Sequence, residues 1–394
     1  MNCCQNKILI HHHATVYCDP NTGALFVPSF IGCWVNEIGK HVSCVGLLFH
    51  ESKEKTSRHD TLIAEDNIKH ENLGAPGSYK DVFKKKRRIK EVCRQVLPNY
   101  NVLIIRGFTP GQFRVFRELS SLKVFFLLVG ALKSSKPPLR FNKVGLIQYV
   151  YFFKRKRELG RIAEKATLLA NSPAVVDEIN EVYHKEAYYV STNTLTSADL
   201  RPEKIWNPKT PLRLFFCGRI VEDKGIFELL EAFHILLKSG VDARLNLAGT
   251  AATEMKQRMR ELTYWKEIES EINFLGFVKF GPELLNTYSE QDIFLLPSYH
   301  EGFPRVVYEA MTFGLPMVLT NLPSYGYTLN HNVDCELVEI QNSYSLYKGI
   351  KILATDTEKY NSYSKNCLEI MEKNYFSFEQ KINHTHQVIT EISK

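Results

Sequence analysis

The stretch between residues 296 and 320, LPSYHEGFPRVVYEAMTFGLPMVLT, constrains the fold of this chain most, because it fits one order of elements: strand, polar turn, helix, strand. The run Ile293–Leu296 is short, apolar and flanked by polar residues, as is typical of a parallel strand covered on both faces. Pro304 suits the first position of a helix, whereas Gly314 followed by Pro316 suits its end. The pattern predicts an α/β unit whose ligands bind outside the carboxyl ends of its strands.

Two glutamates fall in the predicted turn and helix. Glu301 lies on the loop after the strand, and Glu309 lies about one and a half turns into the helix. Two carboxylates at one sheet edge could face one small polar ligand. In the structural alternative, Glu301 only caps the helix and Arg305 pairs with Glu309, a pair worth about 0.3–0.5 kcal/mol when exposed.

A cationic loop precedes another predicted helix. The sequence GRIVEDKG, residues 218–225, places Arg219 and Lys224 beside glycines and a helix N-terminus, which suits a diphosphate. The order of a Walker loop is missing. Alternatively, the two cations are surface residues that pair with Glu222 and Asp223. Together with the carboxylates, the loop would neutralise phosphates and bind hydroxyls, as a nucleotide sugar requires.

Length and element order predict two domains. A chain of 394 residues exceeds the roughly 250–300 residues of most single cores. Strand and helix patterns alternate in both halves, and a proline-rich linker separates them. We therefore expect two doubly wound α/β domains, 1–205 and 206–375, followed by a final segment, 376–394. The irregular stretch 51–80 is interpreted as a variable loop or lid.

Charge and cysteine usage bear on location. The net charge is +7, with basic clusters at 84–88 and 154–157, and the second follows the aromatic run 149–153. Such a segment could lie on an anionic membrane, or be a solvated helix face. No nucleic-acid motif accompanies the charge. Nine scattered cysteines favour free thiols in a reducing compartment, and no signal peptide or spanning segment is evident. We expect a cytoplasmic protein, with peripheral attachment to the inner face of the plasma membrane left open.

The first half offers weaker candidates. The triple histidine His11–His13 ends the first predicted strand, where only His11 and His13 would share a face, and no third ligand is evident. We therefore expect no metal site. Gly23, in the turn that follows, could let backbone approach a ligand or be an ordinary turn glycine. Arg106, after another strand, could meet an anionic acceptor or be a surface arginine.

Three segments together resemble a known family. GRIVEDKG, NFLGFV and LLPSYHEGFPRVVYEAMTFGLPMV are similar to the C-terminal domain of family 4 retaining glycosyltransferases, which have the GT-B fold of two Rossmann-like domains facing each other across a cleft. The resemblance is strong over 212–320 and weak elsewhere. YVSTNTLT resembles the segment before the domain crossover, and the end of the chain resembles a terminal helix that returns to the first domain.

The resemblance implies roles for individual residues. Arg219 and Lys224, next to Gly218, would hold the donor diphosphate and stabilise the charge of the leaving group, and Glu301 would orient the sugar. Glu309 would bind the ribose. The backbone of Gly302, Phe303 and Pro304 would help to hold the sugar and β-phosphate, that of Phe277 and Val278 would meet the base, and Gly23 would stand in for a glycine-rich first loop.

The implied activity is a retaining, metal-independent sugar transfer without a cofactor. A UDP-, GDP- or ADP-linked sugar would be donor, and a glycan or lipid-linked molecule acceptor, in the synthesis of cell-surface polysaccharide, lipopolysaccharide or glycolipid. The chain lacks the histidine that many members carry in the acceptor cleft, so the acceptor side stays unassigned. The alternatives are a nucleotide-sugar epimerase of the same fold and a non-catalytic protein that binds sugar nucleotides or membranes.

Overall fold

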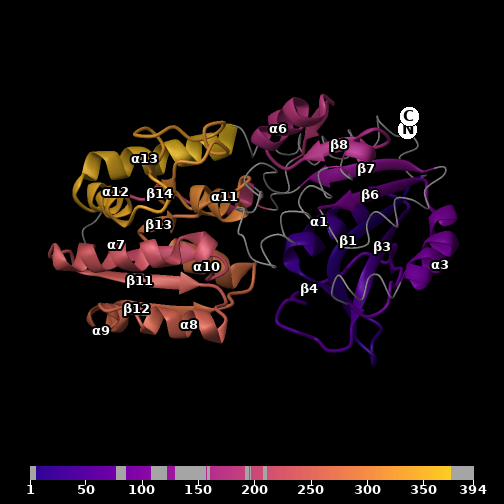
Figure 1. Ribbon diagram of the computed structural model, residues 1–394, viewed down its shortest axis with the longest axis horizontal. Helices are drawn as coiled ribbons and strands as arrows, with labels where there is room; N and C mark the ends of the chain where they lie inside the picture. The colour runs from indigo at the N-terminus through magenta and orange to yellow at the C-terminus, as the bar shows by residue number, and fades with distance from the viewer. Residues whose placement is uncertain are drawn as a thin grey trace. The chain divides into compact units, whose positions relative to one another are not determined.

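The computed structural model describes residues 6–76, 86–107, 122–128, 157, 160–190, 195, 197–206 and 211–373. These residues form two units, the second of which begins at Leu195 (Figure 1). Both units are built on mainly parallel sheets with helices, so the predicted fold class, two doubly wound α/β domains, is confirmed. Some predicted features lie outside the described residues. They are the expected C-terminal helix, residues 149–156 of the basic and aromatic segment, and residues 84 and 85 of the first basic cluster.

The first unit is built on one long strand. β1 (Lys7–Cys18) pairs in parallel with β3 on one side and β6 on the other. The sheet continues in parallel to β5 beyond β3, and to β7, β8 and β9 beyond β6, while β2 and β4 add antiparallel pairs. The further elements are β2 (Leu25–Val27), α1 (Ser29–Gly39), β3 (Cys44–Ser52), β4 (Thr61–Leu62), β5 (Ile68–His70), α3 (Lys86–Val96), β6 (Val102–Arg106), β7 (Lys123–Leu128), β8 (Thr167–Ala170), α6 (Pro173–Tyr183) and β9 (Ala187–Tyr189).

Two sequence interpretations of this unit are wrong. β1 does not end at His13 but continues to Cys18, because its register with β3 shifts between His11 and Thr15 and pairing then resumes. His11 and the adjacent His12 are both buried, because this part of the strand is covered on both faces. The stretch 51–80, taken as a loop or lid, contains β4 and β5, which are part of the sheet.

The second unit has a six-stranded parallel sheet in the order β12-β11-β10-β13-β14-β15. Its interior is apolar on both faces, as parallel strands require. α7 packs against α9 and α12, whereas α11 packs against α10 and α13. The elements are β10 (Leu212–Cys217), α7 (Ile226–Lys238), β11 (Ala243–Ala248), α8 (Thr253–Arg260), α9 (Trp265–Ile268), β12 (Ile272–Gly276), α10 (Pro282–Ser289), β13 (Ile293–Leu296), α11 (Arg305–Thr312), β14 (Met317–Thr320), β15 (Glu336–Val338), α12 (Ser343–Thr355) and α13 (Thr357–Met371).

The strand, turn, helix and strand predicted around Glu301 are present as β13, α11 and β14. Gly314 is left-handed, with φ of 57°, as expected of a residue that ends a helix. The prediction for Pro304 is off by one position: it is the N-cap, with extended φ of −74° and ψ of 141°, and α11 starts at Arg305. Proline's fixed φ suits both positions, so the pattern could not separate them.

The predicted linker is held on the second unit. The backbone N–H of Arg201 donates to the carbonyl oxygen of Thr312 at 3.1 Å, and that of Lys204 to Ser364 Oγ at 2.7 Å. The lysine ammonium also donates to the backbone carbonyls of Ser289 and Gln291, at 2.6 and 2.5 Å. Residues 197–205, which the sequence interpretation gave to the first domain, therefore pack with the second. The sequence could not predict this assignment to the second unit, because it depends on hydrogen bonds to residues more than 100 positions away.

Two further properties concern the described residues only. None of their helices combines the length and the apolar character that a membrane crossing needs. All of their cysteines are free thiols.

Candidate functional site

The second unit's sheet changes direction between β10 and β13. From β10 the chain proceeds to β11 and β12 on one side, and then returns to β13 and proceeds to β14 and β15 on the other. β10 and β13 are parallel neighbours, with Leu214 opposite Ile293. Ligands of open α/β sheets bind at such a switch point, outside the carboxyl ends of the strands. The two loops of interest, 218–225 after β10 and 297–304 after β13, both start there.

The two loops are locked together through backbone. The N–H of Tyr299 donates to the carbonyl oxygen of Asp223 at 3.0 Å. Gly225 has φ of +69°, and a Cβ at this position would lie 2.0 Å from the carbonyl oxygen of Pro297. Only glycine fits such an approach. The geometry of the site therefore depends on Gly225, which has no side chain that could contact a ligand.

Lys224 and Glu301 form an ion pair between Nζ and Oε1, one from each loop. Their side chains are 17% and 12% exposed, so the pair is shielded from solvent but reachable. The sequence placed both residues in one site, and the structure brings them into direct contact. A phosphate that binds Lys224 would have to compete with Glu301 for the ammonium or share it.

Arg219 stands at the end of β10, next to Gly218. It is exposed and forms no ion pair with any part of the chain that the structure describes. The backbone beneath it is fixed, because the N–H of Gly218 donates to the carbonyl oxygen of Ala248 at 2.9 Å and that of Ile220 to Thr250 at 3.1 Å. The local pairing that the sequence left open is not seen: Glu222 pairs with Arg258, and Asp223 lies 3.6 Å from His300.

Glu309 is buried, with 2% of its side chain exposed. The hydroxyl of Tyr288, on α10, donates to its Oε2 at 2.8 Å, while Arg305 Nη2 lies 4.0 Å from Oε1. Burial raises the pKa of this carboxyl, against the opposing effects of Arg305 and the Tyr288 hydrogen bond. The anticipated pair with Arg305 exists at the limit of an ion pair, and Tyr288 is the closer partner.

The loop after β12 approaches the start of α11. Gly276 has φ of +70°, and its carbonyl accepts from the N–H of Gly249 at 2.7 Å. After it, Phe277 is 43% exposed and Val278 packs partly against the core. The guanidinium of Arg305 lies 5.3 Å from the centre of the Phe280 ring. The loop that carries Phe277 and Val278 thus reaches the helix of Glu309 through Phe280.

Gly302, Phe303 and Pro304 form the turn into α11. Phe303 is buried, with its ring 4.5 Å from that of Tyr308 and 5.7 Å from that of Tyr325. Its side chain therefore anchors the turn, and the role of the turn's backbone in holding a ligand stays a prediction.

Comparison with known proteins bears on this unit. Residues 199–369 match the family model described as Glycosyl transferases group 1. This stretch, which is similar to that family, is called the group 1 domain. The match includes both switch-point loops and the loop after β12.

Two relatives match part of the chain. An uncharacterized glycosyltransferase of Haemophilus influenzae is 30% identical over 159 residues, 40% of this chain and 43% of that protein. The capsular polysaccharide biosynthesis glycosyltransferase CapM of Staphylococcus aureus is 24% identical over 162 residues, 41% of this chain and 42% of that protein. The chain thus matches less than half the length of each.

A solved structure extends the likeness to the whole chain. Anabaena HepE in complex with UDP and glucose superposes with a TM-score of 0.67 at 17% identity, over 98% of this chain and 99% of that one. The likeness shows the fold, two Rossmann-like units of the GT-B type, of which the group 1 domain is the second.

The remaining candidates lie in the first unit. Gly23 has φ of +72° in the hairpin turn between β1 and β2, where its N–H donates to the carbonyl of Asp19 at 2.8 Å. Arg106, at the end of β6, is 5% exposed and lies 5.7 Å from the Trp34 ring, which excludes the surface arginine from the two alternatives left open for it. His11 Nδ1 donates to the carbonyl of Leu48 at 2.9 Å. Among the described residues, no group of histidines, cysteines and carboxylates could hold a metal ion.

Several residues of the site carried no clear sequence signal. Tyr288 reaches Glu309 from another helix, and Tyr299 donates to Glu228 Oε1 at 2.8 Å. Burial raises the pKa of Tyr299 to about 12, so it stays a donor at neutral pH. Tyr299 and His300 immediately precede Glu301, and this adjacency was the one available clue. Tyr288 had none, because its role depends on the packing of α10 on α11.

Proposed function

We propose that the protein is a retaining glycosyltransferase that moves a sugar from a nucleotide diphosphate sugar to a glycan or lipid-linked acceptor. One observation carries this most: a cation and a carboxylate, Lys224 and Glu301, meet at the switch point of a group 1 domain. The pair combines a phosphate-binding group with a hydroxyl-binding one, and exposed Arg219 begins the same loop.

In this proposal the cations stabilise the leaving group. As the bond between the anomeric carbon and the donor phosphate breaks, negative charge grows on the diphosphate, and Lys224 and Arg219 would face it. Preorganised charges that face the charge developing in the transition state make the largest contribution to the rate enhancement of many enzymes. No metal ion is assigned a role, because two fixed cations supply the positive charge.

Glu301 would position the sugar. Its carboxylate holds the Lys224 ammonium and has lone pairs left to accept from sugar hydroxyls. The acceptor oxygen would form the new bond on the face that the diphosphate leaves, and the acceptor proton would pass to a phosphate oxygen. Configuration is then retained without a base from the protein.

The nucleoside is proposed to lie between α11 and the loop after β12. Phe277 and Val278 would meet the base, and Glu309 the ribose hydroxyls. Because Glu309 already accepts from Tyr288, the ribose would use its other oxygen, on the side of Arg305. UDP is the first nucleotide to try, since the Anabaena HepE structure contains it.

The biological setting is proposed to be cell-surface glycan synthesis, in line with the name of the Staphylococcus aureus relative. Attachment to anionic membranes also stays a proposal. Of the basic clusters, the structure describes α3, on which Arg87, Arg88 and Arg94 are exposed while Ile89 and Cys93 are buried. Sedimentation with phosphatidylglycerol vesicles at low salt would test attachment, and binding equal to that of neutral vesicles would contradict it.

Ligand binding and turnover test the function. UDP, GDP or ADP should raise the melting temperature by mass action, with or without EDTA. Incubation with the stabilising nucleotide's sugars and mixed glycans should give a product whose anomeric coupling constant matches that of the donor. Donor isomerisation without an acceptor would instead indicate an epimerase. The absence of any product with every nucleotide sugar would indicate a non-catalytic protein. A product whose anomeric configuration is inverted relative to the donor would contradict the retaining mechanism.

A further inference from the structure

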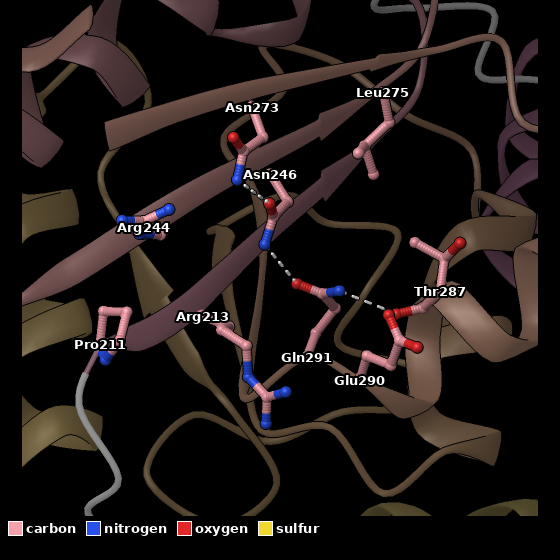
Figure 2. A pocket seen from close by; sticks show the side chains of 9 residues that line it. All are labelled: Pro211, Arg213, Arg244, Asn246, Asn273, Leu275, Thr287, Glu290 and Gln291. Atoms are coloured by element: carbon pink, nitrogen blue, oxygen red, sulfur yellow. Dashed lines mark hydrogen bonds between the residues drawn. The ribbon is translucent and has the colours of Figure 1, made fainter. Parts of the chain in front are cut away.

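A second pocket opens on the second unit's sheet, away from the switch point. It has a volume of about 670 Å³ and lies over β10, β11 and β12, beside the C-terminal end of α10 (Figure 2). Arg213 and Arg244, side by side in the register of β10 and β11, line it near the starts of these strands. Gly218, which opens the donor loop, is five residues further along β10, roughly 16 Å at about 3.3 Å per residue. The two arginines are thus at the other end of the strands, whereas Leu275 lines the pocket from near the carboxyl end of β12.

The floor of the pocket is a chain of amide side chains. Asn273 Nδ2 donates to Asn246 Oδ1 at 2.9 Å, and Asn246 Nδ2 donates to Gln291 Oε1 at 2.8 Å. Gln291 Nε2 completes the chain by donating to the carbonyl of Thr287 at 2.9 Å, as Figure 2 shows. Asn246 and Gln291 are 8% and 4% exposed. Buried amides on a sheet face are costly unless bonded, and this chain fixes the orientation of each one.

The amide chain leaves groups available to a ligand. Each amide nitrogen has two hydrogens and uses one, and Asn273 Oδ1 accepts no bond from the described part of the chain. Asn273 is exposed, so its amide is reached from solvent. The pocket therefore offers donors and acceptors at fixed positions, next to the apolar Leu275, which is 41% exposed.

The charges around the pocket are compensated. Arg213 donates from Nε and Nη2 to the two oxygens of Asp292, at 3.2 and 3.0 Å. Arg244 Nε lies 3.5 Å from Glu271 Oε2, and Glu290 adds a further carboxylate at the rim. Two cations beside three carboxylates do not favour an anionic ligand. These charged groups still supply hydrogen-bond donors and acceptors. The contact with Glu271 uses Nε of Arg244, so its two terminal nitrogens can donate to a ligand.

We propose that this pocket binds a neutral saccharide, as a second carbohydrate site distinct from the donor site. Sugar hydroxyls donate and accept at once, which matches amides, guanidinium groups and carboxylates whose charges cancel, and a sugar's C–H face can lie on Leu275. The volume is within the roughly 300–1,000 Å³ of small-molecule sites and fits a short oligosaccharide. That the saccharide is an acceptor or product rests on the proposed function, whereas the binding does not.

The test uses the full chain and three neutral probes: maltotriose, lactose and N,N′-diacetylchitobiose. Saturation-transfer NMR should show that at least one binds and that saturating UDP does not displace it. Asn273→Ala and Arg244→Ala, both at exposed positions, should each weaken that binding by about tenfold, the effect of losing one or two hydrogen bonds. Arg260→Ala, at an exposed arginine of α8 outside the pocket, is the matched control and should bind the probe as the wild type does.

Each other outcome overturns the proposal. These are no binding of any neutral probe, binding of glucuronate but of no neutral probe, displacement by UDP, and affinity unchanged in both variants. A UDP thermal shift measured on the same samples keeps the two proposals apart. If the wild type binds no neutral oligosaccharide but shows a UDP shift, the result counts against this pocket alone, whereas a missing UDP shift in the wild type counts against the donor site.

Discussion

Lys224 and Glu301 come from loops 77 residues apart and form the central contact of the proposed donor site. Each side chain restrains the other, so a variant of one also changes the surroundings of its partner. A second pair, Glu309 on α11 with Tyr288 on α10, is buried in the same unit. At the scale of single residues, the first pair bears on binding and the second on stability.

Removing the lysine should weaken nucleotide binding. Lys224→Ala deletes a charge-assisted contact to phosphate worth about 1.5–3 kcal/mol, so UDP affinity should fall by about ten- to a hundredfold. Isothermal titration calorimetry measures this. Lys238→Ala, at the last residue of α7 and in an exposed ion pair with Glu267 of α9, is the control. Equal affinities of all three proteins would remove Lys224 from the site.

Removing the tyrosine hydroxyl should destabilise the second unit. Tyr288→Phe leaves a carboxyl oxygen of Glu309 buried without its donor, at a cost of about 1–3 kcal/mol. Urea unfolding reports the loss. Tyr344→Phe, at a ring that is 60% exposed, should change stability by less than about 0.5 kcal/mol. If the two variants unfold alike, the hydrogen bond contributes nothing measurable.

At the scale of elements, the site is made by strands that place two loops side by side. Glycines allow the backbones of neighbouring loops to come into contact. Gly225 lies against the carbonyl of Pro297, and a Cβ on Gly249 would lie 1.7 Å from the carbonyl oxygen of Gly218. Neither glycine could be assigned a role from its sequence position, because the partner backbone comes from another βα loop.

Gly225→Ala should therefore cost more than a left-handed backbone alone. A Cβ in the left-handed region costs about 1–2 kcal/mol, and here it also collides with the Pro297 carbonyl. Gly240→Ala is the matched control, since that glycine has φ of +86° and nothing within 4 Å of an added Cβ. We expect Gly225→Ala to unfold at a lower urea concentration than Gly240→Ala and to lose the UDP thermal shift. Equal midpoints would show that the loops can separate without cost.

At the scale of the whole molecule, the buried histidines of β1 should make stability depend on pH. Burial lowers the pKa of His11 to about 4, and that of His12 is also well below its usual value, with His13 and Arg106 contributing to the latter. Between about pH 4 and 6.5 the unfolded chain then binds more protons than the folded one, so stability rises with pH across this window. Glu309, whose pKa is raised by burial, acts in the opposite direction.

The expected result is a melting temperature that falls as the pH drops from 6.5 towards 4 and is flat just above 6.5. Thermal unfolding followed by circular dichroism measures it. His11→Asn should flatten the slope, while His184→Asn, at an exposed left-handed residue that asparagine tolerates, is the control. A wild-type melting temperature that is constant from pH 4 to 7 would contradict the assignment.

The sequence by itself determined the fold class and the central part of the site. Strand and helix periods, glycine and proline positions and the spacing of Glu301 and Glu309 are local properties, and β13, α11 and β14 follow from them. The loop with Arg219 and Lys224 could also be recognised from local sequence properties. Local patterns erred by one residue at Pro304 and missed the continuation of β1, because sheet pairing past an irregularity depends on neighbouring strands.

Only the tertiary structure decided which of these groups meet. It paired Lys224 with Glu301, gave Glu309 to Tyr288, buried Arg106, and attached residues 197–205 to the second unit. It also gathered Asn246, Asn273 and Gln291 into one pocket. The physical reason is common to all of these cases: their partners are brought together by strand order and helix packing, which act between residues far apart in the chain and leave no period or spacing in the sequence.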